Sequence, residues 1–563
     1  MAKRLSSVGF HEGLKLLRDT LAADPKVTEP LSGDDNSKAE FASPLERPHN
    51  RPPPVPFRQS PTQAVKKAAV STPKSKLNKP AARLGPTNLP PSPGKFSYGA
   101  ISAPRRPNAA PIGPTTPADL PGPEAMKYVA ARVDLTAMRS AAAFPMFVPE
   151  DEERSIQTCV RTGADRLRES SVPDETGFLV GFDFGTSSSK IVIHQPGAQN
   201  LAYALSVPQT LRAVEQGASQ DHLWRSIVWY DANSGRFELY PSGGSTPVEG
   251  FKTGLIQSSG HRMMVGGVTH TQAATAYLAM LIAYVIGHHY RSAPQGFDQS
   301  TQFSRFHFGI PVACKDELGC ADQFKRVLAA AFRLAPFADT LDLSMVNDVL
   351  KTATGNDAVS SETPFLLFEE LAGVIAGYRA SPDHRTGPHV IVDVGASTLD
   401  IATFHIPEGD YKISVFMSAV GLLGAEALRT ARRVDVPDKT FRSACAHQTD
   451  HVLQFTRQQK DIDFQYENGI PKPLLFVGGG RLTDVHNPLY RNYSNALEAP
   501  RRTPEPGSNL TYDRNTDFAR LLLAWGLAQE EFDLPLIKPP SEIEDKVRRQ
   551  HDYRDKYVDK DMC

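Results

Sequence analysis

The sequence contains few cysteines and no long apolar run, and both absences limit the classes of protein to which it can belong. Its five cysteines are scattered, without a CxxC pair or a His/Cys group at metal-ligand spacing, so neither a zinc site nor a disulfide framework is indicated. The longest apolar run, 273–287, falls short of the roughly 20 residues that span a bilayer, and we interpret it as a buried core helix. The N-terminus lacks the continuous apolar region of a secretion signal. We therefore expect a cytoplasmic protein without a transmembrane segment.

Acidic residues are absent from 47–118, although the formal net charge of the whole chain is −1. Pro, Ser, Ala, Lys and Arg dominate 23–120, and such a composition cannot bury enough apolar surface to fold. We predict a disordered basic tail there. Its positive charge suits nucleic acid, an anionic surface or an acidic protein, and a plain solvated tether is the alternative.

Two short segments flank this tail. In 1–22, Phe10, Leu14, Leu17 and Leu21 share one face of a short amphipathic helix, which either docks a protein partner or forms only transiently. Residues 121–176 regain apolar character and are predicted to be a helical lead-in to the folded part.

From residue 177 onward, short β-branched runs alternate with helical segments, a pattern typical of an α/β domain. Two Asp-Gly hairpins about 210 residues apart suggest two related halves. We place a first lobe at 177–388, a second lobe at 389–535 and a charged C-terminal tail at 536–563.

The first hairpin, GFDFGTSSSKIVI at 181–193, has the layout of a phosphate-binding turn. Gly185 lets the backbone turn tightly against phosphate oxygens, and Thr186, Ser187 and Ser188 add hydroxyl donors. Asp183 ends the strand, where its carboxylate can hold Mg²⁺ through water. An ordinary β-turn is the alternative for this hairpin taken alone.

A second copy, HVIVDVGASTLDIATF at 389–404, repeats the pattern. Asp393 corresponds to Asp183, and the residues expected at phosphate are Gly395, Ala396, Ser397 and Thr398. A third element, LLFVGGGRL at 474–482, is a buried strand that runs into Gly478, Gly479 and Gly480. These glycines permit close approach of a base and ribose, or else form a tight turn.

This order of motifs resembles the phosphate-1, phosphate-2 and adenosine motifs of the actin, sugar-kinase and 70-kDa heat-shock-chaperone superfamily. The resemblance covers about 177–535 and is closest to the chaperone nucleotide-binding domain. Further segments similar to those chaperones are FHFGIPV at 306–312, FEELAGVIAGY at 368–378, AVGLLGAEAL at 419–428 and FARLLLAWGLAQ at 518–529. The resemblance implies a duplicated actin-like ATPase fold of ribonuclease-H type, with two lobes around a nucleotide cleft.

The resemblance also implies roles for individual residues. Asp183 and Asp393 would surround Mg²⁺ and the attacking water, and Glu369 would orient that water. The remaining hairpin and glycine residues would contact ATP. Lys252 lies at about the right distance after the first hairpin to match the chaperones' phosphate-contacting lysine, with a solvated surface lysine as the alternative. Catalysis would rest on positioning and charge stabilisation.

Departures from the chaperone pattern keep several functions open. Ala396 and Ser397 replace glycines beside the terminal phosphate and favour slow or altered hydrolysis. The main hypothesis is an ATP-binding, slowly hydrolysing chaperone-like ATPase whose cleft closure regulates a protein partner, without a peptide-binding domain. The alternatives are a filament-forming actin relative, a carbohydrate-type kinase, to which Lys190 also points, and a scaffold that binds nucleotide without hydrolysing it.

Overall fold

The computed structural model describes part of the chain, residues 120–544 with short gaps. The gaps fall at 134–144, 146, 170–176, 198–199, 216–217, 257–259, 299–300, 312–318, 354–363, 410–411, 461–471, 492, 494–496 and 499–503. The predicted helix at 1–22, nearly all of the predicted tail at 23–120 and most of the charged C-terminal tail therefore lie outside the described residues.

The first sheet is built on an antiparallel hairpin of β1 (Phe178–Asp183) and β2 (Ser188–Gln195). Strand β9 (Phe303–Ile310) pairs parallel with β1, and β10 (Phe365–Glu369) pairs parallel with β9. The main path of this eight-stranded sheet is β10-β9-β1-β2-β3-β16, with β5 pairing β2 and β4. The remaining members are β3 (Leu201–Ala204), β4 (Arg212–Glu215), β5 (Ala218–Arg225) and β16 (Leu510–Thr511).

The second sheet repeats this plan. Its antiparallel hairpin is β11 (Gly387–Val394) and β12 (Leu399–Ile406), and β14 (Lys472–Val477) pairs parallel with β11. The six strands follow the order β15-β14-β11-β12-β13-β17. The outer members are β13 (Lys412–Gly421), β15 (Leu497–Glu498) and β17 (Leu536–Lys538). Both sheets therefore place a hairpin beside two parallel strands in the same order.

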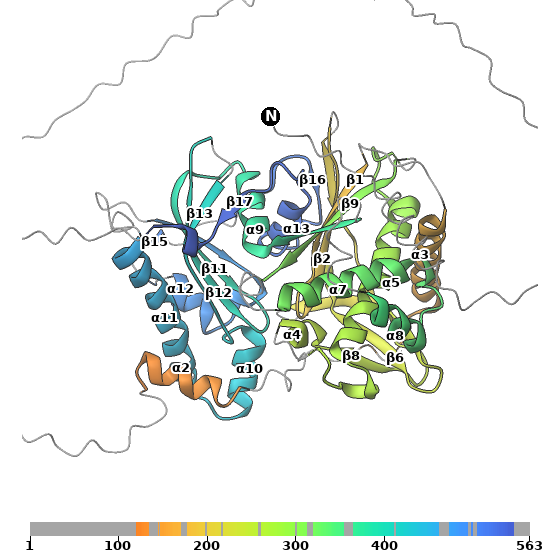
Figure 1. The fold of residues 1–563 in the computed structure, drawn as a ribbon, viewed down its shortest axis with the longest axis horizontal. Helices are drawn as coiled ribbons and strands as arrows, with labels where there is room; N and C mark the ends of the chain where they lie inside the picture. The colour runs from red at the N-terminus through yellow and green to blue at the C-terminus, as the bar shows by residue number, and fades with distance from the viewer. Residues whose placement is uncertain are drawn as a thin grey trace, which may run out of the picture. The chain divides into compact units, whose positions relative to one another are not determined.

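Helices and a small sheet cover the outer side of the first sheet (Figure 1). Helix α5 (His270–Ser292) begins at a capping box of Thr269 and Gln272 and is buried along most of its length, as the apolar run predicts. Its neighbours are α3 (Glu150–Arg168), α4 (Phe251–Ile256), α7 (Cys320–Leu334) and α8 (Leu343–Thr352). The small sheet contains β6 (Ile227–Asp231), β7 (Arg236–Glu238) and β8 (Thr246–Glu249). None of the helices in the described ranges has the length and apolar character needed to cross a bilayer.

A second group of helices packs on the second sheet: α2 (Gly122–Ala130), α10 (Ala425–Arg433), α11 (Asp438–Phe455) and α12 (His486–Arg491). The described parts of the predicted lead-in contain two helices, which pack beside different sheets. Helix α2 packs on α11, which covers the second sheet, whereas α3 packs on α5, which covers the first sheet.

Two helices lie between the sheets, α9 (Glu370–Arg379) and α13 (Leu522–Leu527) (Figure 1). They approach very closely, since a Cβ added at Gly526 would lie 1.8 Å from the backbone oxygen of Gly373. One apolar cluster joins both helices to residues of both sheets. The two halves therefore share a core.

Two segment boundaries predicted from the sequence do not match the structure, and the segment 368–378 begins as a strand. Residues 365–369 form strand β10, which pairs with β9, and helix α9 follows from Glu370. The segment 389–535 is not confined to one half, since β16 pairs with β3 of the first sheet. Strand β17, from the predicted charged tail, extends the second sheet beside β13.

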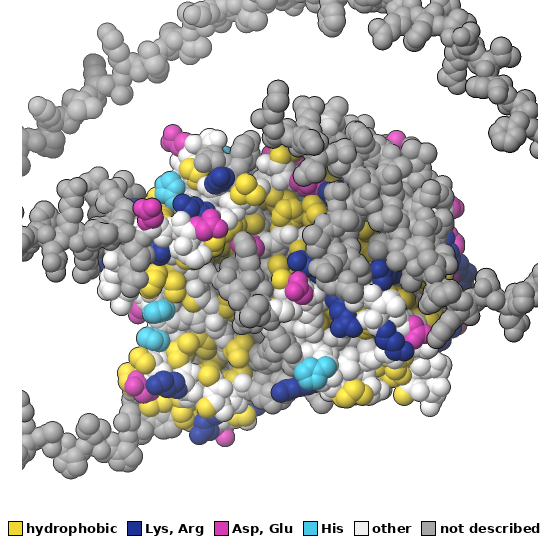
Figure 2. All heavy atoms as spheres, in the orientation of Figure 1, with side chains coloured by type: hydrophobic (Ala, Val, Ile, Leu, Met, Phe, Trp, Pro, Cys, Tyr) yellow, Lys and Arg dark blue, Asp and Glu magenta, His cyan; other side chains and the backbone are white. Residues whose placement is uncertain are grey.

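The cysteines and the surface add two observations. Cys320 is disulfide-bonded, which the scattered cysteine pattern did not indicate, while Cys159 and Cys445 are free. On the face shown in Figure 2, basic and acidic side chains of the described residues are interspersed with neutral and hydrophobic ones.

Candidate functional site

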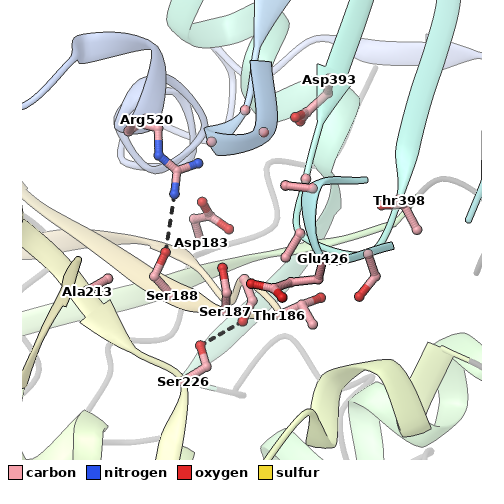
Figure 3. A pocket seen from close by; sticks show the side chains of 18 of the residues that line it. Asp183, Thr186, Ser187, Ser188, Ala213, Ser226, Asp393, Thr398, Glu426 and Arg520 are labelled. Atoms are coloured by element: carbon pink, nitrogen blue, oxygen red, sulfur yellow. Dashed lines mark hydrogen bonds between the residues drawn. The ribbon is translucent and has the colours of Figure 1, made fainter. Parts of the chain in front are cut away.

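A cavity of about 510 Å³ lies where the two hairpins meet. Residues of both sheets and of α4, α9 and α10 line it (Figure 3). Of the residues predicted from the sequence, the structure brings fourteen to this cavity: Asp183, Gly185, Thr186, Ser187, Ser188, Lys252, Asp393, Gly395, Ala396, Ser397, Thr398, Gly478, Gly479 and Gly480. Glu369 is the exception.

The first hairpin presents Asp183 at the end of β1. The cross-strand neighbour of Asp183 is Lys190, whose Nζ lies 3.0 Å from its carboxylate and also donates to the Ser188 carbonyl. Both side chains are almost fully buried. Lys190 thus balances the charge of Asp183 inside the cavity wall.

Hydroxyl groups behind the first turn hold its backbone in place. The Ser226 hydroxyl donates to the Gly185 carbonyl at 2.7 Å, and the Ser226 N–H donates to the Ser187 carbonyl at 3.1 Å. Ser226 in turn contacts Ser189, which accepts a hydrogen bond from the Tyr277 hydroxyl. The turn is therefore anchored to the interior of the first half.

The second turn is anchored by the N-terminus of α10. The N–H groups of Gly424, Ala425 and Glu426 donate to the carbonyls of Ser397, Gly395 and Ala396 at 2.7–3.1 Å. These donors are among the first-turn N–H groups that a helix leaves unpaired. Helix α10 is thereby fixed directly to the loop between β11 and β12.

This anchoring orients the peptide groups of both turns. The C=O and N–H of a trans peptide point in opposite directions. Because the turn carbonyls are hydrogen-bonded on one side, the N–H groups of Thr186, Ala396 and Ser397 point to the other side. Successive N–H groups of this kind form a concave site for an anion. The second turn has two such N–H groups in succession, and both turns line the same cavity.

The glycine turn after β14 lies against the second hairpin. Gly478 has φ +83°, and a Cβ there would lie 2.2 Å from the Asp393 carboxylate. The short helix η10 (Gly479–Leu482) follows. Arg481 pairs with Asp517, the N-cap of the short helix η11 (Phe518–Arg520).

Lys252 and Glu370 form an ion pair at the cavity that the sequence did not predict. Lys252 is buried, and its Nζ lies 2.7 Å from the Glu370 carboxylate, so it is not a solvated surface lysine. Glu369 ends β10 opposite Ile310, and its side chain is not among those lining the cavity. Glu370, the first residue of α9, lines the cavity, where the sequence predicted Glu369.

Six carboxylates line the cavity: Glu249, Glu426 and an acidic cluster of Asp183, Glu370, Asp393 and Asp400. Burial, with the charges of Glu370 and Asp183, raises the pKa of Asp393 to about 6. Burial and the charge of Asp393 raise the pKa of Asp400 to about 8. Burial lowers the pKa of Lys252, but Glu370, Asp183 and Asp400 outweigh it and leave that pKa above its ordinary value. Burial is the larger cause of both increases, and with a pKa of about 8 Asp400 is mostly protonated at neutral pH.

Sequence reasoning missed several of these residues. Asp400 pairs with Asp393 across the β11–β12 ladder, so hairpin symmetry was the signal that could have found it. Glu370 and Val374 line the cavity at helical spacing, but the start of α9 was not visible in the sequence. Arg520 lies in the segment FARLLLAWGLAQ at 518–529, but the resemblance assigned no role to this residue.

Comparison of the sequence with protein-family models and with curated proteins finds no match in either.

In the described part of the chain, no group of three or more His, Cys, Asp or Glu is placed to hold a metal ion.

Proposed function

We propose that the protein binds ATP in this cavity and hydrolyses it slowly, as an ATPase of the actin and heat-shock-chaperone type. The observation that carries the proposal is the pair of turns whose backbones are both held from behind and face one cavity. Phosphate chains are the common ligands of such paired anion sites. The shared order of the two sheets supports a duplicated actin-like fold.

Mg²⁺ would enter the cavity together with the phosphates, because the described residues form no direct ligand group of three or more side chains. Burial and neighbouring carboxylates raise the pKa of Asp393 and Asp400, and a divalent cation nearby would favour their ionised forms. Asp183 and Asp393 would hold the ion through water, in keeping with the preference of Mg²⁺ for oxygen ligands and for part of its hydration shell. The ion would supply neutralisation of phosphate charge.

Glu370 is the residue best placed to orient an attacking water. It begins α9 at the cavity wall, and Lys252 holds its carboxylate at 2.7 Å. A carboxylate fixed in this way can accept a hydrogen bond from water beside the terminal phosphate. The remaining contribution is positioning and charge stabilisation by Lys190, Lys252 and the turn N–H groups.

Closure of the cavity would regulate a protein partner. The hydroxyls of Thr253 and Ser397 lie 3.4 Å apart, although α4 belongs to the first half and the β11–β12 loop to the second. A terminal phosphate between the two turns would alter such contacts and so the relative position of the halves.

A nucleotide-binding scaffold is the second candidate. The Ser397 side chain is buried and faces Thr253, and Ala396 adds a methyl group to the cavity wall. Both features leave less room at the second turn than consecutive glycines would.

Phosphate release with Mg²⁺ tests hydrolysis, using the adjacent pair Glu370→Ala and Glu369→Ala. We expect Glu370→Ala to lower the rate about a hundredfold or more while ATP still binds. Glu369→Ala should behave as wild type because its side chain does not line the cavity. ATP binding by wild type without phosphate release would favour the scaffold. Equal effects of the two variants would overturn the role of Glu370.

A further inference from the structure

Arg520 reaches from one half of the molecule to the other. It is the last residue of η11, which packs beside β14 of the second sheet. Its guanidinium donates to the Ser188 hydroxyl of the first hairpin at 3.4 Å. Figure 3 shows the side chain extending across the cavity toward Ser188, with Asp183 beside its path.

The surroundings of Arg520 hold this side chain in position. The Asp517 carboxylate accepts a hydrogen bond from the Ala519 N–H at 3.1 Å and pairs with Arg481 of the glycine turn. A Cβ added at Gly479 would lie 2.5 Å from the guanidinium carbon of Arg520. The guanidinium therefore packs on bare backbone, in space that any side chain at position 479 would fill.

Two buried lysines of the cavity each lie beside a carboxylate. Lys190 lies 3.0 Å from Asp183, and Lys252 lies 2.7 Å from Glu370. The guanidinium of Arg520 lies between the turn of the first hairpin and the glycine turn after β14. It is near Asp393, and its positive charge lowers the pKa of Asp393. A planar guanidinium has several donors in a fixed arrangement and binds phosphate oxygens through two of them at once.

We infer that Arg520 binds phosphate oxygens of the nucleotide close to the ribose, and so joins the bound nucleotide to both halves of the molecule. The inference rests on the proposed nucleotide-binding function and deepens it. Ser188 and Gly479 fix the position of Arg520 along the nucleotide. Ser188 belongs to the turn expected at the phosphates, and Gly479 belongs to the turn expected at the nucleoside.

Calorimetric titration of the full-length protein with adenosine, ADP and ATP, the nucleotides with Mg²⁺, tests this role. We expect Arg520→Gln to weaken ADP and ATP about 10- to 100-fold, the loss of charge-assisted hydrogen bonds, and to leave adenosine unchanged. Arg520→Lys keeps the charge but loses the planar donors, so its loss should be smaller. The control is Arg154→Gln, the same change at an exposed arginine of α3, and this variant should bind all three ligands as wild type does.

Each outcome has one meaning. Loss of ADP and ATP with unchanged adenosine supports the phosphate contact. Equal weakening of adenosine, or a melting temperature of the unliganded variant well below that of wild type with all ligands affected alike, assigns Arg520 a structural role and overturns the inference. Unchanged ADP and ATP binding in both Arg520 variants also overturns it, while leaving the proposed function intact. Only failure of the wild type to bind ADP and ATP counts against the proposed function itself.

Discussion

Lys252 and Glu370 form an ion pair at 2.7 Å, although 118 residues separate them in the sequence. The lysine comes from the short helix α4 of the first half, and the glutamate begins α9 between the sheets. This pair fixes a carboxylate at the cavity wall and couples its position to α4.

Replacement of Lys252 should lower both the free energy of unfolding and the rate of ATP hydrolysis. Lys252→Met leaves Glu370 without its partner, and the free energy of unfolding should fall by about 3 kcal/mol, the lower end for a broken buried pair, because Glu370 is partly exposed. The double variant Lys252→Met/Glu370→Gln should regain most of this loss in urea denaturation. A single variant as stable as wild type would contradict the account.

The support of the first turn can be tested at Ser226. Ser226→Ala removes the hydrogen bond to the Gly185 carbonyl and should lower stability by about 1 kcal/mol, with weaker ATP binding because the turn loses its anchor. The control is Ser234→Ala, the same change at an exposed serine. Calorimetric binding curves that are identical for the two variants would exclude this role for Ser226.

Buried histidines make stability depend on pH. Burial lowers the pKa of His307, His389 and His486 to about 4, whereas an unfolded chain has histidines near 6.5. Between these values the unfolded state binds protons that the folded state does not. Stability should therefore fall as the pH drops from about 6.5 toward 4, by about 1.4 kcal/mol per pH unit for each histidine.

The matched variants for this prediction are His307→Asn and His261→Asn. Asparagine can replace the hydrogen bond from His307 Nδ1 to the Leu527 carbonyl but does not titrate, so denaturation curves should show a shallower pH dependence. His261 is exposed, and its replacement should leave the dependence unchanged. An unaltered slope in His307→Asn would show that this histidine does not drive the acid sensitivity.

The crossing of α9 and α13 depends on glycine. Gly526→Ala places a methyl group against the backbone of Gly373 and should cost about 1–3 kcal/mol or more, despite the higher helix propensity of alanine. Gly243→Ala, at a glycine with open space around it, is the control. Thermal melting distinguishes them, and a stabilised Gly526→Ala would refute the close packing.

Local pattern predicted much of the fold and of the cavity. Both hairpins were predictable because an apolar strand, an acid and a glycine turn lie within a few residues of one another. Helix α5 was predictable from its apolar run. These features depend on neighbours in the sequence, which a single sequence displays.

What could not be predicted depends on distant partners. The one-residue error at Glu369 arose because pairing with β9, not local preference, decides where β10 ends. The burial of Lys252 depends on Glu370, and the reach of Arg520 depends on Gly479 and Asp517. The packing of α2 on the second sheet is likewise a long-range contact without a sequence signal.

ATP binding in the presence of Mg²⁺, measured by calorimetry on wild type and Asp183→Asn, tests the central claim most directly. The account predicts saturable binding by wild type, weakened at least about tenfold when Asp183 loses its charge, because that carboxylate faces the cavity beside Lys190. Absence of ATP binding by wild type would contradict the assignment of the cavity as a nucleotide site.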